Sequence, residues 1–437
     1  MSGVALIVVS IVVLLCLFAL GVPVLIAFLL CDLTGLFLIT GSAGVGMFAN
    51  SMFNTGTTAA LVTIPLFLLV GEILSRGSAI EVMFSSVDTI IGKIRGRQYV
   101  LTIVLATIFG ALSGTAMGVA AMLGRSVLPG MLSRRYDLRL SSGAIMAGAS
   151  LAPIIPPSVL VIVIGTLAGV SISNLMVAGI LPGLVLASLF LGYILIRVHL
   201  NPTLAPTDIQ PSDSETKSTS VVGAFIRVLP VGIVILSIMG LIVLGIATPS
   251  EAAATGVVGS IITVALYRGL SVQMLRDSFH SAAYTSAMIL VIMVASKIFS
   301  QLLAFTGATA EITQAIAGLG LPPASMLVLM LALPFVLCMF IDQIALMMVI
   351  IPIYRPIITQ LGFDPLWFWL LFLINVTVGG MTPPFGYTIF ALKGAAQNIP
   401  LTELFRAAWP FVALFVLAIV LFACVPSIVT TLPRALL

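Results

Sequence analysis

Two apolar stretches of the sequence are interrupted by paired prolines, and both interruptions expose groups that bind ions. The first reads APIIPPS at residues 152–158, and the second reads GMTPPFG at residues 380–386. Because proline has no backbone N–H, each pair stops the hydrogen-bond ladder of a helix and frees carbonyl oxygens. In lipid a freed carbonyl needs another partner, and broken membrane helices use such carbonyls to hold an ion or a substrate. The two interruptions therefore predict a binding site.

Sodium is the ion that suits these segments. A hard cation prefers oxygen ligands, and a broken helix presents carbonyl oxygens together with Ser and Thr hydroxyls. The N-terminus of the half-helix that follows carries partial positive charge and suits an anionic group of a substrate. A purely structural kink is the alternative for either motif alone. Two such breaks, each paired with a hairpin, favour the functional interpretation.

Asp342 is the leading candidate among the ionisable side chains. It lies in apolar sequence, in the tetrapeptide FIDQ beside Gln343, and an ionisable residue inside a membrane protein is a functional candidate by default. Its carboxylate could bind a cation, carry a proton or orient a polar substrate. The alternative is a carboxylate that only caps the end of a helix.

The other ionisable side chains in or near apolar spans have simpler explanations. Glu72 lies four residues before Arg76, and an ion pair along one helix accounts for it. Lys297 lies deeper in its span and is expected to snorkel or to pair with a carboxylate, with a direct substrate role as the minority interpretation. His199 and His280 lie at span edges without a second nearby ligand, so neither supports a metal site.

Glu251 is also interpreted as structural. It belongs to the sequence TPSE, which opens an apolar span. Thr248 can cap the helix, Pro249 suits its first turn, and Glu251 can reach back to the free N–H groups.

A common offset of 227 residues relates landmarks in the two halves of the sequence. Chance scatter among 24 prolines is the alternative to an internal repeat. The related landmarks are Pro129 with Pro356, Pro156 with Pro383, Thr115 with Asp342 and, with a slip of one residue, Pro23 with Pro249. The offset predicts two structural repeats in which Thr115 and Asp342 occupy equivalent positions.

Composition places these residues in a helical membrane protein that crosses the bilayer several times. Of the 437 residues 61% are hydrophobic and 7% are charged, and so few charges cannot cover a soluble fold of this length. The apolar runs are continuous rather than alternating, which excludes a β-barrel. Residues 1–15 carry no side-chain charge, so the first run is expected to be a retained helix and not a cleaved signal. The four cysteines lie in apolar runs and are expected to be free thiols. No Walker motif is present, so direct drive by ATP is not expected.

Twelve apolar spans are the elements expected to position the candidate residues. Each is long enough to enter or cross the hydrocarbon layer. They lie at residues 3–20, 22–40, 57–76, 99–131, 141–169, 172–196, 228–247, 249–267, 278–303, 322–353, 366–392 and 402–426.

The spans predict an all-α polytopic membrane protein that consists of two inverted repeats. The segment at 201–220 is rich in Pro, Ser, Thr and Asp, and it is expected to be a solvent-exposed linker between the halves. The predicted units are a first repeat at 1–200 with a hairpin at 98–133 and a broken helix at 141–169, a cytoplasmic linker at 201–225, and a second repeat at 226–437 with a hairpin at 322–355 and a broken helix at 366–392.

The distribution of Lys and Arg predicts the orientation in the membrane. Basic clusters at 93–97 and 134–139 flank the first hairpin. If both clusters are cytoplasmic, that hairpin is re-entrant, with its tip near Ser113 to Thr115. Continuing the count puts Arg355 and Arg434 outside, so the second hairpin enters from the opposite side. The N-terminus is then expected to be periplasmic or extracellular.

Taken together, the motifs resemble those of the large membrane subunit of tripartite ATP-independent periplasmic (TRAP) transporters, and the resemblance covers nearly the whole chain. The order of the motifs is highly specific, although any one of them alone is weak. They are PLF at 65–67 with GE at 71–72, GALSGTA at 110–116, APIIPPS at 152–158, GILPG at 179–183, TPSEAA at 248–253, FDP at 363–365 and TPPFG at 382–386.

The resemblance implies an elevator-type transporter of the bacterial inner membrane. In such a transporter two hairpins and two broken helices move against a scaffold, and sodium drives uptake of an organic acid anion, such as a carboxylate, a sugar acid or a sulfonate. A periplasmic substrate-binding protein delivers the anion. A small four-helix membrane subunit, expected here as a separate chain, supports the scaffold. Two or more sodium ions and no organic cofactor are implied.

The resemblance also implies site residues. One sodium ion would be held by Ser113 with the carbonyls of Ala152, Ile155 and Pro157, and a second by Cys338, Gly379, Thr382 and Phe385. The substrate would lie between them, near Thr115, Ser158, Asp342 and Gln343.

Two features depart from the family pattern. Ala152 and Cys338 stand where many members have glycine, which puts the tight geometry of the ion sites in question. Trp367 and Trp369 stand where smaller or polar residues are common, and they are expected to anchor at the membrane interface or to mark a different subunit contact.

Two other classes of protein compete with this interpretation. A stand-alone sodium/dicarboxylate symporter of similar architecture is the nearer alternative, and uptake without a binding protein would distinguish it. A membrane-embedded enzyme is the second, but the sequence offers no convincing Ser/His, Asp/Asp or metal constellation.

Overall fold

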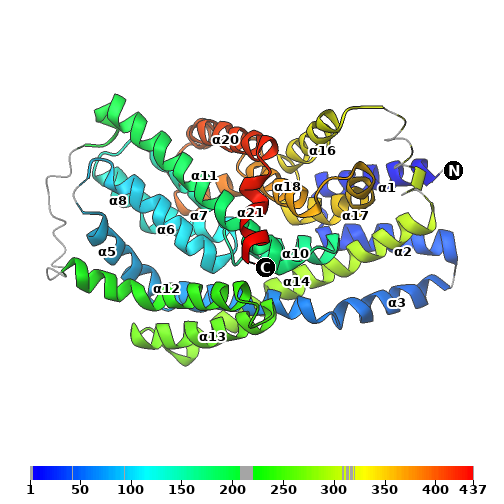
Figure 1. Cartoon of the computed structure of the whole chain (residues 1–437), viewed down its shortest axis with the longest axis horizontal. Coiled ribbons are helices and arrows are strands. Elements are labelled where there is room, and N and C mark those ends of the chain that lie inside the picture. Colours follow the sequence, from blue (N-terminus) through cyan, green and yellow to red (C-terminus); the bar gives the residue numbers. More distant parts are fainter. Residues whose placement is uncertain are drawn as a thin grey trace.

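A computed structural model of the chain describes residues 3–41, 43–92, 94–206, 220–307 and 320–436, together with positions 310, 311, 314 and 318. Within these residues the fold is helical and contains no strand, and Figure 1 shows an elongated molecule of packed helices. Eight of the helices are long and apolar enough to cross a membrane. Lys93, Lys217 and positions 207–219 of the expected linker lie outside the described residues.

The helices fall into two series along the chain. The first series comprises α1 (Gly3–Ala19), α2 (Val24–Thr40), α3 (Ala43–Gly56), α4 (Thr63–Arg76), α5 (Ala79–Ile91), α6 (Arg97–Ser113), α7 (Ala116–Ser126), α8 (Leu128–Ser133), α9 (Leu138–Ala149), α10 (Val159–Ala168) and α11 (Ile172–Leu200). The second comprises α12 (Val221–Val243), α13 (Pro249–Leu266), α14 (Val272–Phe305), α16 (Pro323–Cys338), α17 (Gln343–Leu361), α18 (Pro365–Gly379), α19 (Tyr387–Ala395), α20 (Leu401–Cys424) and α21 (Ser427–Leu436).

Side-chain caps set many of the helix starts. A Ser, Thr or Asp side chain accepts a hydrogen bond from the first turn and satisfies an N–H that has no helical partner. At α13 this is a full capping box, in which Thr248 and Glu251 bond to each other's backbone N–H, so the structural interpretation of Glu251 is confirmed. The other side-chain caps are Asp137 on α9, Ser158 on α10, Ser171 on α11, Ser220 on α12, Ser271 on α14, Asp342 on α17 and Asp364 on α18.

Each series contains a helical hairpin followed by a broken helix. The hairpins are α6–α7 and α16–α17, and the broken helices are α9–α10 and α18–α19. α7 begins at Ala116 and α17 at Gln343, and 343 minus 116 is 227. α9 begins at Leu138 and α18 at Pro365, and 365 minus 138 is again 227. The helix boundaries therefore share the offset that relates the prolines. Cis peptide bonds join Pro156 to Pro157 and Pro383 to Pro384.

The two hairpins and the two broken helices exchange partners between the halves. α10 packs against α17, and α19 packs against α7. A Cβ added at Gly124 of α7 would lie 2.6 Å from the Leu392 side chain of α19, and one added at Gly169, after α10, would lie 2.9 Å from the Arg355 guanidinium. Each hairpin is therefore completed by a broken helix of the other half.

A second group of helices packs around the pair α4 and α14. α13 lies against α4, α12 lies against α13 and α5, and α2 and α3 lie against α14. In Figure 1 these helices lie along one long side of the molecule, with α12 and α13 toward one end, α2 and α3 toward the other, and α14 between them. The pair meets the first hairpin where α4 contacts α6, and the second where α14 contacts α17.

The structure differs from the sequence-based expectation in two places. Three helices, α3, α5 and α21, lie outside the twelve expected spans. Asn, Ser, Glu and Asp break up the apolar runs of α3 and α5, which hid these two helices in the sequence. Trp367 and Trp369 are buried, and Trp367 Nε1 donates to the carbonyl of Phe422 at 2.9 Å. Both roles expected of these tryptophans are wrong, since they fill the interior of this chain.

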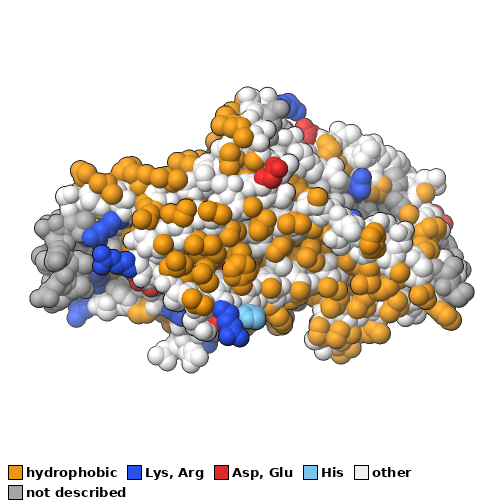
Figure 2. All heavy atoms as spheres, turned by 90° about the horizontal axis from the view of Figure 1, so that it is seen from below, with side chains coloured by type: hydrophobic (Ala, Val, Ile, Leu, Met, Phe, Trp, Pro, Cys, Tyr) orange, Lys and Arg blue, Asp and Glu red, His pale blue; other side chains and the backbone are white. Residues whose placement is uncertain are grey.

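The molecular surface agrees with a membrane location. In Figure 2 hydrophobic side chains cover a broad part of the face shown, and charged side chains occur in small separate groups. All four cysteines are free, as expected.

Candidate ion and substrate site

The first hairpin ends in a tight turn that carries two hydroxyl groups. Gly114 has a φ of +61°, in the left-handed region that favours glycine, and its N–H bonds to the carbonyl of Gly110. The Oγ of Ser113 lies 3.4 Å from the N of Thr115. The Thr115 hydroxyl has no hydrogen-bond partner among the described residues, and both side chains are half-buried. The turn thus leaves the Thr115 hydroxyl free to meet a ligand.

The first break supplies carbonyl oxygens. Within the described part of the chain, no backbone N–H donates to the carbonyls of Ala152, Ile155 or Pro157. Ser158 is fully buried; its hydroxyl donates to the carbonyl of Pro153 at 2.6 Å and accepts from the N–H of Val161 at 3.4 Å. Ser158 therefore closes the loop and starts α10, while the three carbonyls stay available to an ion.

The hairpin tip and the break lie directly against each other. A Cβ added at Gly114 would lie 3.7 Å from the carbonyl oxygen of Pro157, and one added at Gly110 would lie 2.9 Å from the Cα of Ala152. Ser113 follows Gly110 by one turn of the same helix. The structure therefore brings the segment of Ser113 onto the segment that carries the three carbonyls.

Two further glycines allow neighbouring helices to pack closely against this junction. A Cβ at Gly71 of α4 would lie 2.6 Å from the carbonyl oxygen of Leu112, and one at Gly179 of α11 would lie 2.4 Å from that of Ile154. Only a residue without a Cβ fits at either distance. The GE and GILPG motifs thus serve to let α4 and α11 approach the hairpin tip and the break.

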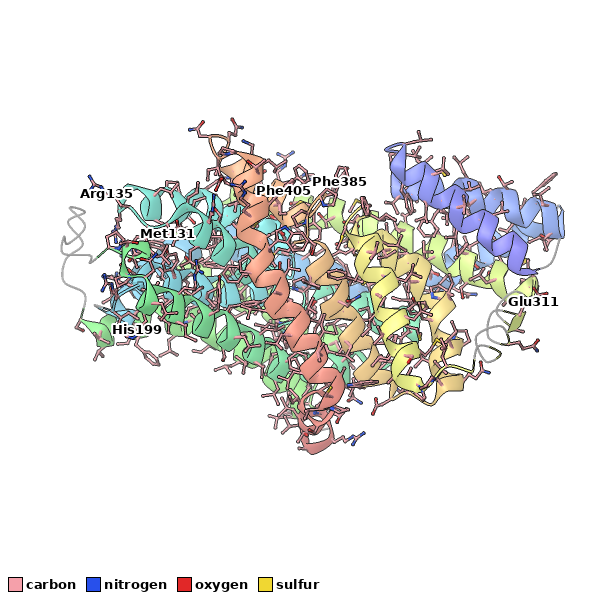
Figure 3. The ribbon with its side chains drawn as sticks, turned by 90° about the horizontal axis from the view of Figure 1, so that it is seen from above. Met131, Arg135, His199, Glu311, Phe385 and Phe405 are labelled. Atoms are coloured by element: carbon pink, nitrogen blue, oxygen red, sulfur yellow. The ribbon has the colours of Figure 1, made fainter. Side chains whose placement is uncertain are left out.

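The second junction repeats this arrangement with different side chains. A Cβ added at Gly379 would lie 2.3 Å from the Cβ of Cys338, and the N–H of Phe385 donates to the carbonyl of Met339 at 3.2 Å. The Thr382 hydroxyl is buried and donates to the carbonyl of Val378 at 2.7 Å. A hydroxyl that donates its proton keeps its lone pairs, so Thr382 can still face a cation. Phe385 is exposed, and Figure 3 shows it near the middle of the long axis of the molecule.

The two residues that depart from the family pattern are explained by these contacts. Ala152 lies opposite Gly110, and Cys338 lies opposite Gly379. In the first half the glycine is on the hairpin and the larger residue on the break, and in the second half the two have changed sides. Each junction keeps one glycine, so the close approach of the two segments is retained.

Asp342 caps α17 in the structure. Its Oδ1 accepts hydrogen bonds from the N–H groups of Ile344 at 2.9 Å and Ala345 at 3.3 Å. Oδ2 has no hydrogen-bond partner among the described residues, and the side chain is exposed. The capping alternative is therefore observed, and one carboxylate oxygen stays available beside it.

Gln343 and Tyr387 form a second polar pair at this junction. The Tyr387 hydroxyl donates to Oε1 of Gln343 at 2.8 Å. The Tyr387 ring rests on Gly380, where an added Cβ would lie 1.8 Å from the ring. The NH₂ group of Gln343 makes no hydrogen bond to the described residues, so it is available as a donor to a ligand. Sequence reasoning missed Tyr387, although its place directly after TPPFG was a usable signal.

The candidate residues lie at two junctions, one in each half of the chain. Within the described residues, no hydrogen bond joins Thr115 or Ser158 of the first half to Asp342 or Gln343 of the second. The candidate ligands form two separate groups, one at each junction. A substrate that touches both groups would have to bridge them.

The ion pairs of the described residues do not include the candidate ligands of either junction. Five occur among the described residues: Glu72–Arg76, Asp88–Arg97, Arg139–Glu403, Arg406–Glu403 and Asp364–Arg434. The first confirms the helical pair expected for Glu72, whose Oε1 also accepts from Ser281 at 2.9 Å. None includes Lys297, so the described structure provides no carboxylate partner for it.

Across the described residues, no three His, Cys, Asp or Glu side chains lie close enough together to hold a metal ion. An ion here would depend on backbone carbonyls and hydroxyls, the ligand type that suits sodium. At the start of α9, the Glu403 carboxylate of α20 raises the pKa of the Arg139 guanidinium by a hydrogen bond and by charge attraction.

Comparison with known proteins gives a family and several relatives. The family model described as "Tripartite ATP-independent periplasmic transporter, DctM component" matches residues 11–428. The ectoine TRAP transporter large permease TeaC of Halomonas elongata is 29% identical over 94% of both chains. The 2,3-diketo-L-gulonate TRAP transporter large permease YiaN of Escherichia coli is 26% identical over 94% of this chain and 95% of its own. The isethionate TRAP transporter permease DctMQ of Oleidesulfovibrio alaskensis is 28% identical over 93% of this chain and 63% of its own.

The fold is also shared with solved transporter structures. The YdaH transporter of Alcanivorax borkumensis superposes with a TM-score of 0.61 at 15% identity, over 91% of this chain and 89% of that one. At this identity the likeness concerns the fold alone.

Proposed function

We propose, from the premise that this chain belongs to the DctM component family of tripartite ATP-independent periplasmic transporters, that it imports a small organic acid anion together with sodium. The family makes the chain the large permease of a multi-pass inner-membrane transporter, not an enzyme, since its relatives are named as permeases. Sodium coupling, the substrate class and the mechanism are the proposed parts.

The observation that carries the sodium proposal is the pair of junctions. At the first, three carbonyls without backbone donors lie against the turn that holds Ser113. At the second, Thr382 and the backbone of Cys338 and Gly379 occupy the matching places. A bound sodium ion would be attracted by the partial negative charge of these oxygens. Each ion would thereby link a hairpin to a broken helix.

The substrate is proposed to be a carboxylate, a sugar acid or a sulfonate. Two of the relatives are named for 2,3-diketo-L-gulonate and isethionate, each of which carries one small anionic group. The NH₂ group of Gln343, the Thr115 hydroxyl and the N-termini of α10 and α19 can donate to such a group. Asp342 would then act through its free oxygen on a cation or a substrate hydroxyl.

The mechanism is proposed to be an elevator. The hairpins and broken helices of two inverted repeats would move together, because α10 packs against α17 and α19 against α7. The helices around α4 and α14 would stay in place as the scaffold. The partners are proposed to be a periplasmic binding protein and a separate small membrane subunit. The relative named DctMQ is a longer permease, of which this chain spans 63%.

Reconstitution tests the proposal. The chain is placed in liposomes with the small subunit, and uptake of a radiolabelled organic acid is measured with the loaded binding protein outside. Uptake is expected only with an inward sodium gradient and only with the binding protein. Equal uptake driven by a proton gradient in sodium-free buffer would refute the proposed coupling to sodium. Uptake without any binding protein would favour a stand-alone symporter.

A further inference from the structure

Helix α17 contains a carbonyl that its own helix cannot satisfy. Pro352 lies within α17 and has no N–H, so the carbonyl of Met348, four residues earlier, loses its helical donor. Residues 345–351, which surround this carbonyl, are all buried. A buried carbonyl without a donor destabilises the arrangement that contains it. A partner from another helix is therefore required.

Ser296 of α14 supplies that partner. Its hydroxyl donates to the carbonyl of Met348 at 2.6 Å, and its side chain is fully buried. A helical serine ordinarily turns its hydroxyl back to its own helix, as Ser286 of the same helix does to Ala282 at 2.5 Å. Ser296 instead reaches across to the second hairpin.

This bond is unusual among the contacts of the α4–α14 pair. Within the described part of the chain, it is the only hydrogen bond that joins α4 or α14 to a hairpin or a broken helix. The contact with the first hairpin is made by Gly71, which touches the tip without bonding to it. A bond of this kind fixes one relative position of two helices, because it is lost when they slide by a few ångströms.

We propose that Ser296 is a positioning residue that holds the second hairpin against α14 in the arrangement seen here. The bond stabilises this arrangement over any in which α17 has moved along α14. This inference rests on the proposed function, since it assumes that the hairpins move against the α4–α14 pair. Pro352 sets the position of the bond by freeing the carbonyl of Met348.

Distance measurements on the reconstituted chain test the proposal. Spin labels are carried by noncanonical amino acids at Val258 of α13 and Val328 of α16, two exposed positions, so the native cysteines stay in place. Ser296→Ala is expected to lower the ratio of the present arrangement to the moved one by about fivefold. Ser286→Ala, which removes a hydroxyl that bonds only within α14, is the matched control and is expected to leave the ratio unchanged.

A second variant separates the bond from general damage to packing. Pro352→Ala restores an N–H four residues after Met348, so the carbonyl no longer needs Ser296. Ser296→Ala is expected to change the ratio less in that background than in the native one. Equal changes in both backgrounds, or no change in the native one, would overturn the proposal.

Uptake measurements distinguish failure of this inference from failure of the proposed function. If the unmodified chain takes up no substrate with its binding protein, the proposed function fails. If the unmodified chain shows a single spin-label distance in every condition, both the elevator movement and the positioning role of Ser296 are refuted. If it transports and shows two distances that Ser296→Ala does not redistribute, only the role of Ser296 is lost. Thermal unfolding of each variant confirms that the compared chains are folded.

Discussion

The first hairpin–break junction places its glycine on the hairpin, at Gly110, whereas the second places it on the broken helix, at Gly379. The facing residues are Ala152 and Cys338, both of which carry a Cβ. Two residues with side chains cannot meet at these distances, so one member of each pair has to be glycine. The comparison shows that each junction needs one glycine in the facing pair, and that either the hairpin or the broken helix can supply it.

The two junctions also differ in their polar groups. The first offers the hydroxyls of Ser113, Thr115 and Ser158 and carries no charge. The second offers a carboxylate at Asp342 and an amide at Gln343. The candidate site therefore has only neutral side chains in one half and includes a carboxyl side chain in the other. Four substitutions test how far the two junctions differ.

Gly379→Ala is expected to have the largest effect. Its new Cβ would lie 2.3 Å from the Cβ of Cys338, and overpacking of this kind costs about 3 kcal/mol of stability. Uptake is expected to be lost. Adding Cys338→Gly removes the opposing Cβ and is expected to restore both thermal stability and uptake. If the double variant is no better than the single one, the exchange of glycine between the two sides is not what permits the contact.

Asp342→Ala is expected to abolish uptake while leaving expression intact. The loss of the cap costs about 1 kcal/mol, which thermal unfolding can detect. Asp342→Asn separates the two roles of the carboxylate, because asparagine caps a helix as well as aspartate does but carries no charge. It is expected to unfold like the native chain and still fail to transport. Full uptake by the Asn variant would reduce Asp342 to a helix cap.

Gly110→Ala is expected to be less harmful than Gly379→Ala. Its nearest neighbour would be the Cα of Ala152 at 2.9 Å, with the Cβ at 3.1 Å. The expected loss of stability is about 2 kcal/mol. Because a backbone atom stays close, Ala152→Gly is expected to rescue this variant only in part. Complete rescue would show that the two junctions respond alike.

Tyr387→Phe is expected to have the smallest effect. It removes one hydrogen bond to Gln343, worth about 1 kcal/mol, and keeps the ring on Gly380. Substrate affinity, measured by uptake at several concentrations, is expected to weaken by a few fold, with sodium dependence unchanged. Unchanged affinity would separate Gln343 from substrate recognition. Tyr267→Phe, which also removes a hydroxyl bond, here to the Arg227 carbonyl, is the matched control.

Much of the helical framework could be predicted because proline and capping residues act locally. The prolines of the two breaks, the turn at Gly114 and the box at Thr248 each depend on neighbours within a few residues, and the structure places helix ends at all of them. The offset that pairs Thr115 with Asp342 also separates the starts of α7 and α17, which the structure places at Ala116 and Gln343. Charge patterning gave an orientation that stays a prediction, as does the inverted arrangement of the repeats.

The contacts between distant segments could not be predicted. Nothing near Cys338 shows that Gly379 faces it, and nothing near Ser296 shows that its hydroxyl reaches α17. Trp367 and Trp369 were misread for the same reason, because an aromatic side chain looks alike in sequence whether a lipid or another helix covers it. The sodium ligands stay a prediction from family resemblance, since the junctions support them without testing them.

The exchange of partners between the halves has a consequence for synthesis of the chain. α7 ends at Ser126, but α19, which covers it, begins at Tyr387, 261 residues later by subtraction. At a translation rate of about 5–20 residues per second, the first hairpin waits roughly 13–50 seconds for its partner. During that interval the face of α7 that α19 will cover stays open to lipid, chaperones or the insertion machinery.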